Sequence, residues 1–470
     1  MVIEVLTDLS FLDPGSKWPP PDEAARLKKY AENRLLFEGE HNKVYKDWVR
    51  LLREDRQAIL EIILNWHKRL SLLWADLLLS ETPTIASKVQ KSGERKSKEQ
   101  KEIEAITEKD FFNILYETVI DISRYGTGIL NIYSTGQNGV ISSTPPSIWF
   151  PVVSEDNIKI VLFHVLAWIV TSGKITYLKV QIHDQGKYEI RKYLLQDGVI
   201  KRQVEAPQVR NTGLDDFAII PIHNVVTSDT IYGMDDYSDL DSILQEMEIR
   251  IAQISRILDK HSDPNMYGDE EAMEEDEETG EVKFRGGGKF FPVSQGGVTP
   301  GYIVWDAQLE ANWKELEFLL SQLYILSETS SACFGDLKQG NAESGAALRR
   351  LMLAALAKTQ RIRLRMDPAV KKALRLCASL DGVDMKNSPI SITWKDGLPR
   401  DDREDAEIMA IRTGSTGGAR TISVHTAIGR LDNLTDEEVE QEMERIQEDE
   451  YATVPTATPP YSGDNRGEIE

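Results

Sequence analysis

The spacing of apolar residues changes twice along this chain, and each change predicts a different kind of structure. Between residues 22 and 80 apolar side chains recur every three or four positions, which predicts amphipathic helices. From about 128 to 227 they alternate with polar ones in segments separated by DQG and QDG, which predicts an antiparallel β meander. Pro221 lies in the last of these segments and predicts an edge strand, because proline cannot donate to a β ladder.

Helical spacing returns in two later segments, 236–260 and 308–328, with apolar residues at alternating steps of four and three. A period of 3.5 residues gives a narrow apolar seam, which is suited to packing along a neighbouring helix at a shallow angle. Two ordinary amphipathic core helices are the alternative interpretation. The seam residues are Leu240, Leu244, Met247, Ile251, Ile254, Leu258, Leu309, Trp313, Leu316, Leu320 and Leu323.

Several segments between the helices predict loops or small insertions. Residues 87–102 are polar and basic, which predicts a loop and, less favoured, a DNA-binding arm. Residues 261–307 predict a small α/β insertion, so that the two seam helices flanking it form a hairpin with a compact tip. Within the insertion the acidic run 269–281 predicts a solvated loop, and the glycine-rich part after it predicts short strands. A final helical pair is expected within 421–450.

The stretch SACFGDLKQGNAESGAALRR, residues 331–350, leads from a small, polar and glycine-containing segment into a cationic helix. Pro368 predicts a kink in that helix, because it removes a backbone hydrogen bond. A solvated face or salt bridges would explain the cations, and a channel or intersubunit surface is the functional alternative. These candidate channel or intersubunit cations are Arg349, Arg350, Lys358, Arg361 and Arg365.

Composition narrows the function classes. The formal net charge of −22 over 470 residues argues against tight, non-specific binding of nucleic acid, although DNA can still slide past such a surface. Cys333 and Cys377, the two cysteines, make a disulfide framework unexpected and predict a reducing compartment. The N-terminus lacks the cationic start of a signal peptide, and the apolar runs are too short to predict a membrane span.

The sequence offers little chemistry. The seven histidines and two cysteines show no metal-ligand spacing, and FRGGGKFF lacks the ending of a phosphate-binding loop. A contiguous acidic run such as 269–281 is usually solvated, whereas catalytic carboxylates sit on rigid elements. We therefore expect no catalytic residue, no metal and no cofactor. A metal-dependent DNA-processing enzyme is a less favoured alternative, as is another ring-forming pore or connector.

Five segments, taken together and in this order, resemble the portal proteins of tailed bacteriophages, particularly those of siphophages that infect Gram-positive hosts. They are IPIHNVVTSDTIYGMDDYSDLDSILQEMEIRIAQISRILDKHSDP, GGKFFPVSQGGVTPGYIVWDAQLE, AESGAALRRLMLAALAKTQRIR, ISITWKDGLPRDDREDAE and TISVHTAIGR followed by DEEVEQEMERI. The resemblance covers roughly residues 25–450. It implies an elongated, mainly helical α+β subunit with an antiparallel meander and a small α/β clip.

The resemblance also implies a division of the chain into the parts of a portal subunit. The wing would comprise residues 1–235 and the long kinked helix and strand at 346–399. The stem helices, 236–260 and 308–328, would pack against neighbouring subunits. The clip would be 261–307, the tunnel loop 329–345, the crown 400–450 and a disordered tail 451–470.

Function and partners follow from the same resemblance. Portal proteins form rings, usually of twelve subunits, at one capsid vertex of the virion, after assembly in the host cytoplasm. Double-stranded DNA is packaged and ejected through the ring. Expected partners are the terminase large subunit, the head-completion adaptor, and the major capsid and scaffolding proteins, with no membrane involved. In the tunnel loop, Lys338, Gln339 and Asn341 would contact DNA phosphates, and the clip would meet the motor through Asp269, Glu270, Glu271, Arg285 and Lys289.

Overall fold

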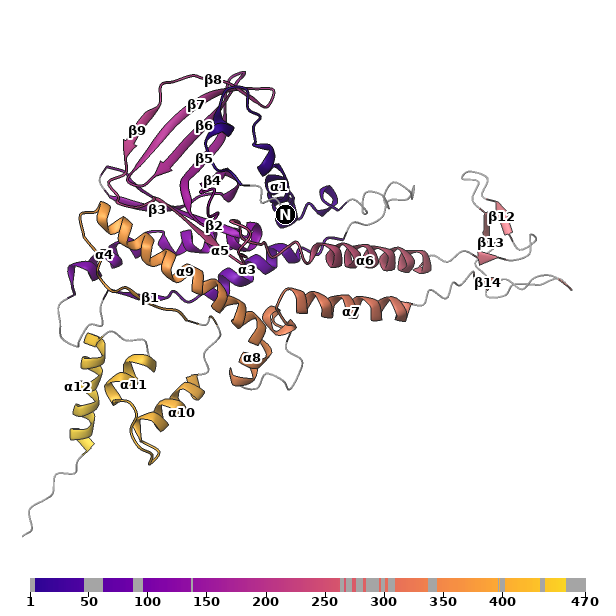
Figure 1. Cartoon of the computed structure of the whole chain (residues 1–470). Helices are drawn as coiled ribbons and strands as arrows, with labels where there is room; N and C mark the ends of the chain where they lie inside the picture. The colour runs from indigo at the N-terminus through magenta and orange to yellow at the C-terminus, as the bar shows by residue number, and fades with distance from the viewer. Residues whose placement is uncertain are drawn as a thin grey trace, which may run out of the picture.

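Antiparallel sheets and helices build an elongated subunit of the expected α+β class (Figure 1). A large sheet lies at one end, a layer of helices follows, a helical arm projects sideways, and a further group of helices lies at the other end. The computed structural model describes residues 5–45, 62–87, 96–136, 138–262, 266–267, 273–275, 282–284, 296, 301–302, 309–336, 345–395, 397, 402–431 and 436–453.

The first helices are shorter than the periodicity predicts. The described residues 62–65 are not helical, so the helical spacing between residues 22 and 80 does not give helix at every position. The Asn65 side chain instead accepts a hydrogen bond from the Lys68 amide at 3.2 Å and starts a new helix as its N-cap. Ser97 caps another helix inside the segment expected to be a loop. These helices are α1 (Ala24–Glu38), α3 (Trp66–Leu79), α4 (Lys98–Thr107) and α5 (Phe111–Tyr125).

The predicted meander is divided between two sheets. After β3 the chain passes Pro145 and Pro146, which cannot donate to a ladder, and the next strand joins a different sheet. The larger sheet has the order β4-β5-β6-β7-β8, with β9 also paired to β7; the smaller has the order β10-β2-β3, so Pro221 lies in an edge strand as predicted. The strands are β2 (Thr127–Ser134), β3 (Gly139–Ser143), β4 (Trp149–Val153), β5 (Val161–Ser172), β6 (Ile175–Asp184), β7 (Lys187–Gln196), β8 (Val199–Gln203), β9 (Gln208–Asn211) and β10 (Ile219–His223).

Two hydrophobic clusters hold most of the body together. The larger joins α3, α5 and α9 (Leu353–Leu380) to the smaller sheet, with Trp74 and Leu115 fully buried. The second lies on the larger sheet, where N-terminal residues such as Leu12 and Trp18 cover Val165 and its neighbours. Apolar positions of the alternating strands thus find partners on one face, as expected for a half-covered antiparallel sheet.

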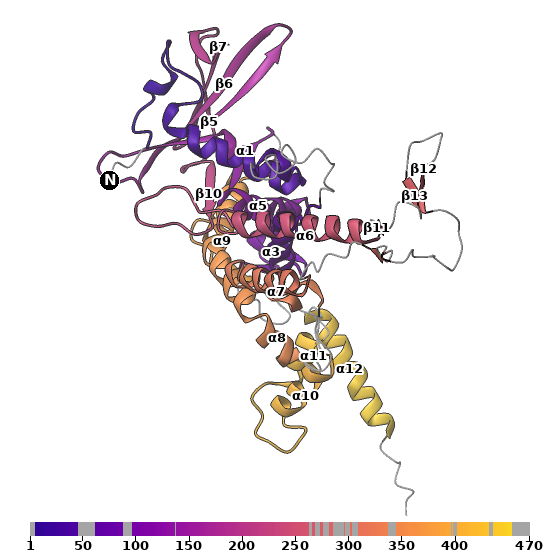
Figure 2. The same ribbon diagram turned by 90° about the vertical axis from the view of Figure 1, so that its right-hand side faces the viewer.

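The projecting arm consists of α6 (Asp241–Ser262) and α7 (Leu309–Leu326), which lie side by side (Figures 1 and 2). At its far end short antiparallel pairs form: β11 (Met266–Tyr267) with β14 (Gly301–Tyr302), and β12 (Met273–Glu275) with β13 (Val282–Phe284). Because β12 lies inside the acidic run, the expectation that this run is entirely a loop is wrong.

The C-terminal third also differs in detail. Helix α8 (Gly345–Leu351) is separated from α9 at Met352, while Pro368 lies inside the continuous α9. Strand β15 (Ser391–Thr393) pairs with β1 (Thr84–Ala86), far away in sequence. Beyond it the pair of helices expected within 421–450 is present as α11 (Val424–Leu431) and α12 (Asp436–Thr453), and a further helix, α10 (Asp402–Thr413), precedes it.

Candidate functional site

The base of the candidate tunnel loop is firmly attached to the body. Where α7 ends, the Ser327 hydroxyl donates to the Leu323 carbonyl at 2.7 Å and lies 2.8 Å from the Thr329 hydroxyl. The Trp66 ring packs against Tyr324 and Phe334, with centroids 5.6 and 4.6 Å apart. An aromatic cluster therefore holds the chain in place just before residue 337.

Glu328 connects this base to helix α9. Its φ of 57° lies in the left-handed region, which non-glycine residues rarely adopt and which costs on the order of 1 kcal/mol. The Glu328 carboxylate accepts a hydrogen bond from the Arg361 guanidinium. Arg361 is therefore half-exposed and paired within its own subunit.

The residues expected to contact DNA and the motor lie outside the described part of the chain. This applies to Lys338, Gln339 and Asn341 of the candidate tunnel loop. It applies equally to the clip residues Asp269, Glu270, Glu271, Arg285 and Lys289. Their roles stay predictions.

Lys358 is not a channel or intersubunit cation. It is 7% exposed, its ammonium donates to the Asp236 carboxylate, and it lies 4.9 Å from the centroid of the Trp74 ring. Periodicity places Lys358 on one stripe with Arg361 and Arg365, but the helix is covered on the Lys358 side. The lysine holds α9 against the body instead.

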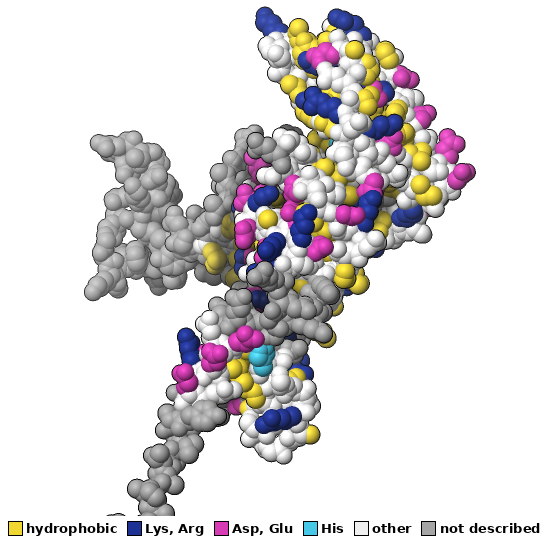
Figure 3. Space-filling model, turned by 90° about the vertical axis from the view of Figure 1, so that its left-hand side faces the viewer, with side chains coloured by type: hydrophobic (Ala, Val, Ile, Leu, Met, Phe, Trp, Pro, Cys, Tyr) yellow, Lys and Arg dark blue, Asp and Glu magenta, His cyan; other side chains and the backbone are white. Residues whose placement is uncertain are grey.

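The other candidate cations remain at the surface. Arg349 and Arg350 are exposed on α8, and Arg365 is exposed on α9, at the rim of a cavity. Figure 3 shows cationic and acidic side chains interspersed over one face of the sheet and the helical layer, despite the net negative charge.

Most of the seam is already buried inside one subunit. Leu240, Leu244, Met247, Ile254, Leu316 and Leu323 belong to the larger core cluster, and Ile251 and Leu320 pack against it. Leu258 and Trp313 are about half exposed, and the side chain of Leu309 lies outside the described part. The seam thus joins α6 to α7 and to the body, so only its two exposed members have area left for another subunit.

Apolar side chains are also exposed away from the seam. On α7, Phe318 and Ile325 lie two helical turns apart and are 61% and 65% exposed, and on α9 Leu364 is 76% exposed. Neighbouring exposed apolar side chains such as the pair on α7 suit a surface that becomes covered in an assembly. We call Phe318 and Ile325 the outer face of α7. Sequence analysis missed it because the stronger seam pattern dominates this helix.

Buried histidines were also missed, because they are isolated in sequence. His41 Nδ1 lies 2.6 Å from the Glu248 carboxylate, and His67 Nε2 lies 3.1 Å from that of Asp241. Burial lowers the pKa of His67 despite Asp241. Asp241 and Glu248 are seven residues apart on α6, so these pairs fasten the start of the arm to the N-terminal region.

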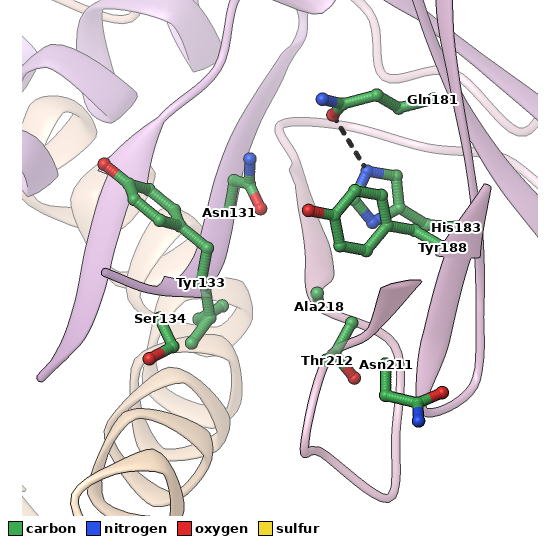
Figure 4. Close-up of a pocket in the computed structure, with 10 residues that line it drawn as sticks. Asn131, Tyr133, Ser134, Gln181, His183, Tyr188, Asn211, Thr212 and Ala218 are labelled. Atoms are coloured by element: carbon green, nitrogen blue, oxygen red, sulfur yellow. Dashed lines mark hydrogen bonds between the residues drawn. The ribbon is translucent and has the colours of Figure 1, made fainter. Parts of the chain in front are cut away.

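A polar cavity of about 320 Å³ separates the two sheets (Figure 4). His183 and Tyr188 project from the larger sheet with stacked rings 5.1 Å apart, while Asn131 and Tyr133 come from β2. Burial lowers the pKa of His183 to about 4, so its imidazole is neutral at pH 7. The cavity is a gap left where the two sheets meet, and no acid–base pair or nucleophile with an adjacent base is found among the described residues that line it.

Within the described residues no group of three or more His, Cys, Asp or Glu side chains could hold a metal ion. Across that same part of the chain, no helix is long and apolar enough to cross a membrane.

Fold and surface together define a subunit that exposes apolar area on a projecting helical arm, as ring-forming proteins do. The family described as Phage portal protein, SPP1 Gp6-like matches residues 17–456. The chain therefore belongs to the phage portal protein family, whose members form the ring-shaped channel of a tailed-phage capsid. Comparison with curated proteins finds no match.

Solved structures similar to this chain include parts of gene transfer agent particles. "Virion of native gene transfer agent (GTA) particle" is 11% identical, covers 89% of this chain and 96% of its own, and gives a TM-score of 0.46. "Neck of empty GTA particle computed with C6 symmetry" is 13% identical over 82% and 93%, with a TM-score of 0.48. "Neck of native GTA particle computed with C12 symmetry" is 13% identical over 78% and 89%, with a TM-score of 0.40.

Proposed function

We propose that about twelve copies of this portal subunit assemble into a ring at one vertex of a virion capsid, and that double-stranded DNA enters and leaves through its centre. The observation that carries this proposal is the outer face of α7, where Phe318 and Ile325 are exposed on an arm whose described seam residues are mostly buried within the subunit. Covering each side chain in a neighbouring subunit would contribute about 2 kcal/mol.

The division into wing, stem, clip, tunnel loop and crown is part of the proposal. The two sheets with α1, α3 to α5 and α9 would form the wing, α6 and α7 the stem, and α10 to α12 the crown. The packing of Trp66 against Tyr324 and Phe334 supports a tunnel loop at 329–345 whose first residues are held against the body. Lys338, Gln339 and Asn341 would then contact passing phosphates without reading bases.

The portal family is structural, and we propose that this subunit likewise supplies no catalysis. Energy for packaging would come from the terminase large subunit docked at the clip, which the head-completion adaptor would later replace. The major capsid and scaffolding proteins would surround the wing during assembly in the host cytoplasm. The acidic run at 269–281 suits a basic surface on the motor.

Ring formation is the test of this function. Negative-stain imaging and native mass measurement of the purified protein should show a ring of about a dozen subunits with a central hole. A compact monomer at concentrations where portal rings persist would count against the proposal. The loop is tested separately: Lys338→Ala with Asn341→Ala should leave the ring intact and reduce the retention of packaged DNA.

A further inference from the structure

A second cavity, of about 440 Å³, opens where β4, β5, β10 and the loop after β10 meet helix α9. Its wall is apolar on one side, with Trp149, Val161 and Ile231. The other side carries nitrogen and hydroxyl donors. These come from Lys159, His223, Ser228 and Arg365. We call this space the Arg365 cavity.

Arg365 has no partner of its own there. Among the residues that the structure describes, none forms an ion pair or hydrogen bond with its guanidinium, whereas Arg361 one turn earlier is paired with Glu328. Arg365 is thus exposed at the cavity rim without a described acid beside it, although the chain carries 77 acidic residues and a net charge of −22. Five planar donors are therefore available to a ligand.

His223 presents a further donor to the same space. The Thr127 hydroxyl accepts from the Gly233 amide at 3.2 Å and lies 3.0 Å from His223 Nδ1. In the tautomer whose Nδ1 accepts from this hydroxyl, the neutral ring carries its proton on Nε2, which has no partner among the described residues. Burial, followed by the charges of Arg365 and Lys159, lowers the pKa of His223 to about 4.

Lys159 completes the set. Its ammonium donates to the Thr227 carbonyl at 2.6 Å and also to the Thr230 carbonyl, which fixes its position and leaves one N–H. Asp229, in the same loop, is not part of the cavity wall and accepts from the Thr227 hydroxyl at 2.5 Å. The Lys159 charge contributes to lowering the pKa of Asp229, so this acid balances part of the Lys159 charge from outside the cavity, whereas no described acid is paired with Arg365.

We propose that the Arg365 cavity binds a single oxyanion, a carboxylate or a phosphate group, between the Arg365 guanidinium, the Lys159 ammonium and His223 Nε2. Two cations and a neutral imidazole N–H offer donors to the oxygens of such a group, since charge-assisted hydrogen bonds are the strong ones. The adjoining apolar wall suits the carbon part of the ligand.

Two sources can supply the oxyanion. One is a free anion such as phosphate. The other is an Asp or Glu side chain of an adjacent subunit, and this source alone rests on the proposed ring. Leu364 beside Arg365 is 76% exposed, so this part of α9 is open to a neighbour.

Binding is measured by titrating inorganic phosphate, and separately acetate, into the purified protein at constant ionic strength. Calorimetry gives the dissociation constant, and NMR of 15N-labelled histidine follows the His223 ring. We expect phosphate to raise the pKa of His223, because a bound anion favours the imidazolium. Arg365→Gln should weaken phosphate binding about tenfold. Arg202→Gln, an exposed arginine on β8, is the matched control and should change nothing.

The mass of the ring distinguishes the two sources. If Arg365→Gln assembles as the wild type while losing phosphate, the free anion is the ligand. If Arg365→Gln and added phosphate both weaken the ring, the ligand is a carboxylate of the adjacent subunit. The proposal is overturned if phosphate and acetate do not bind and Arg365→Gln assembles normally, or if Arg202→Gln weakens binding equally. Absence of a wild-type ring would refute the proposed function, while the phosphate titration would still decide the cavity.

Discussion

The helical core of the body and the arm formed by α6 and α7 differ in how far their large apolar side chains are buried. In the body Trp74 and Leu115 are fully buried among apolar side chains of the same chain. On the arm Trp313 of the seam and Phe318 of the outer face are 54% and 61% exposed, although most described seam residues of the same helix are packed within the subunit. The apolar core of the body is therefore formed within one chain, whereas the arm retains apolar area that an isolated subunit leaves in water.

The largest difference in stability is expected between two single variants, one that removes a tryptophan of the body and one that removes a tryptophan of the arm. Trp74→Ala should lower the free energy of unfolding by about 4 kcal/mol, since it removes a buried ring and leaves a cavity. Trp313→Ala should lower it by less than about 1 kcal/mol, because half of that side chain is already in water. Urea denaturation of the dissociated subunit measures both. Equal losses would show that the arm is as self-contained as the body.

The ion pair under α9 is the next test. Lys358→Met should cost about 3 kcal/mol, because Asp236 stays buried without its cation. The double variant Lys358→Met with Asp236→Asn should recover part of that loss, because it removes the unpaired buried charge. If the loss came from packing alone, the second change would recover nothing. Arg361→Gln, on the same helix, breaks a half-exposed pair and should cost below about 1 kcal/mol.

These two cations also show where sequence reasoning stops. Helical period placed Lys358 and Arg361 on one stripe, but it could not show that Asp236, 122 residues away, covers one and not the other. Alternation of apolar and polar residues located β5 to β8 closely. No feature of the local sequence, however, predicted that β2 pairs with β10 in a separate sheet. Likewise the 3.5-residue period indicated a hairpin of two helices, without showing that most of its seam packs against α7 and the body of the same chain and not against a neighbouring subunit.

Lowering the pH should reduce the free energy of unfolding through His183 in the larger sheet, by less than the loss of Trp74 or Lys358 does. Burial lowers the pKa of His183 from 6.5 to about 4. The unfolded chain therefore takes up a proton below pH 6.5 that the folded chain refuses, so stability is complete above pH 6.5 and falls between pH 6.5 and 4. From pH 8 to pH 5 the loss is about 2 kcal/mol for this histidine.

His183→Gln should remove that part of the pH dependence, as measured by urea denaturation at both pH values. His425→Gln in α11, remote from both sheets, serves as the control and should leave it in place. An unchanged slope in His183→Gln would mean that the ring is solvated and protonates freely in the folded state.

Phe318 on the outer face of α7 should matter least for the stability of the subunit and most for the assembly of the ring. Phe318→Ser on the outer face of α7 should change the free energy of unfolding of the dissociated subunit by less than about 0.5 kcal/mol, since the ring is already 61% exposed. In the assembly the same change should remove about 2 kcal/mol from each interface and raise the concentration needed for ring formation by at least about tenfold. Native mass measurement over a dilution series detects this shift, with Glu317→Ser, an exposed neighbour, as the control. Rings of Phe318→Ser that persist on dilution as the wild type does would place the subunit contact elsewhere, and the exposed Leu364 face of α9 would be the next surface to change.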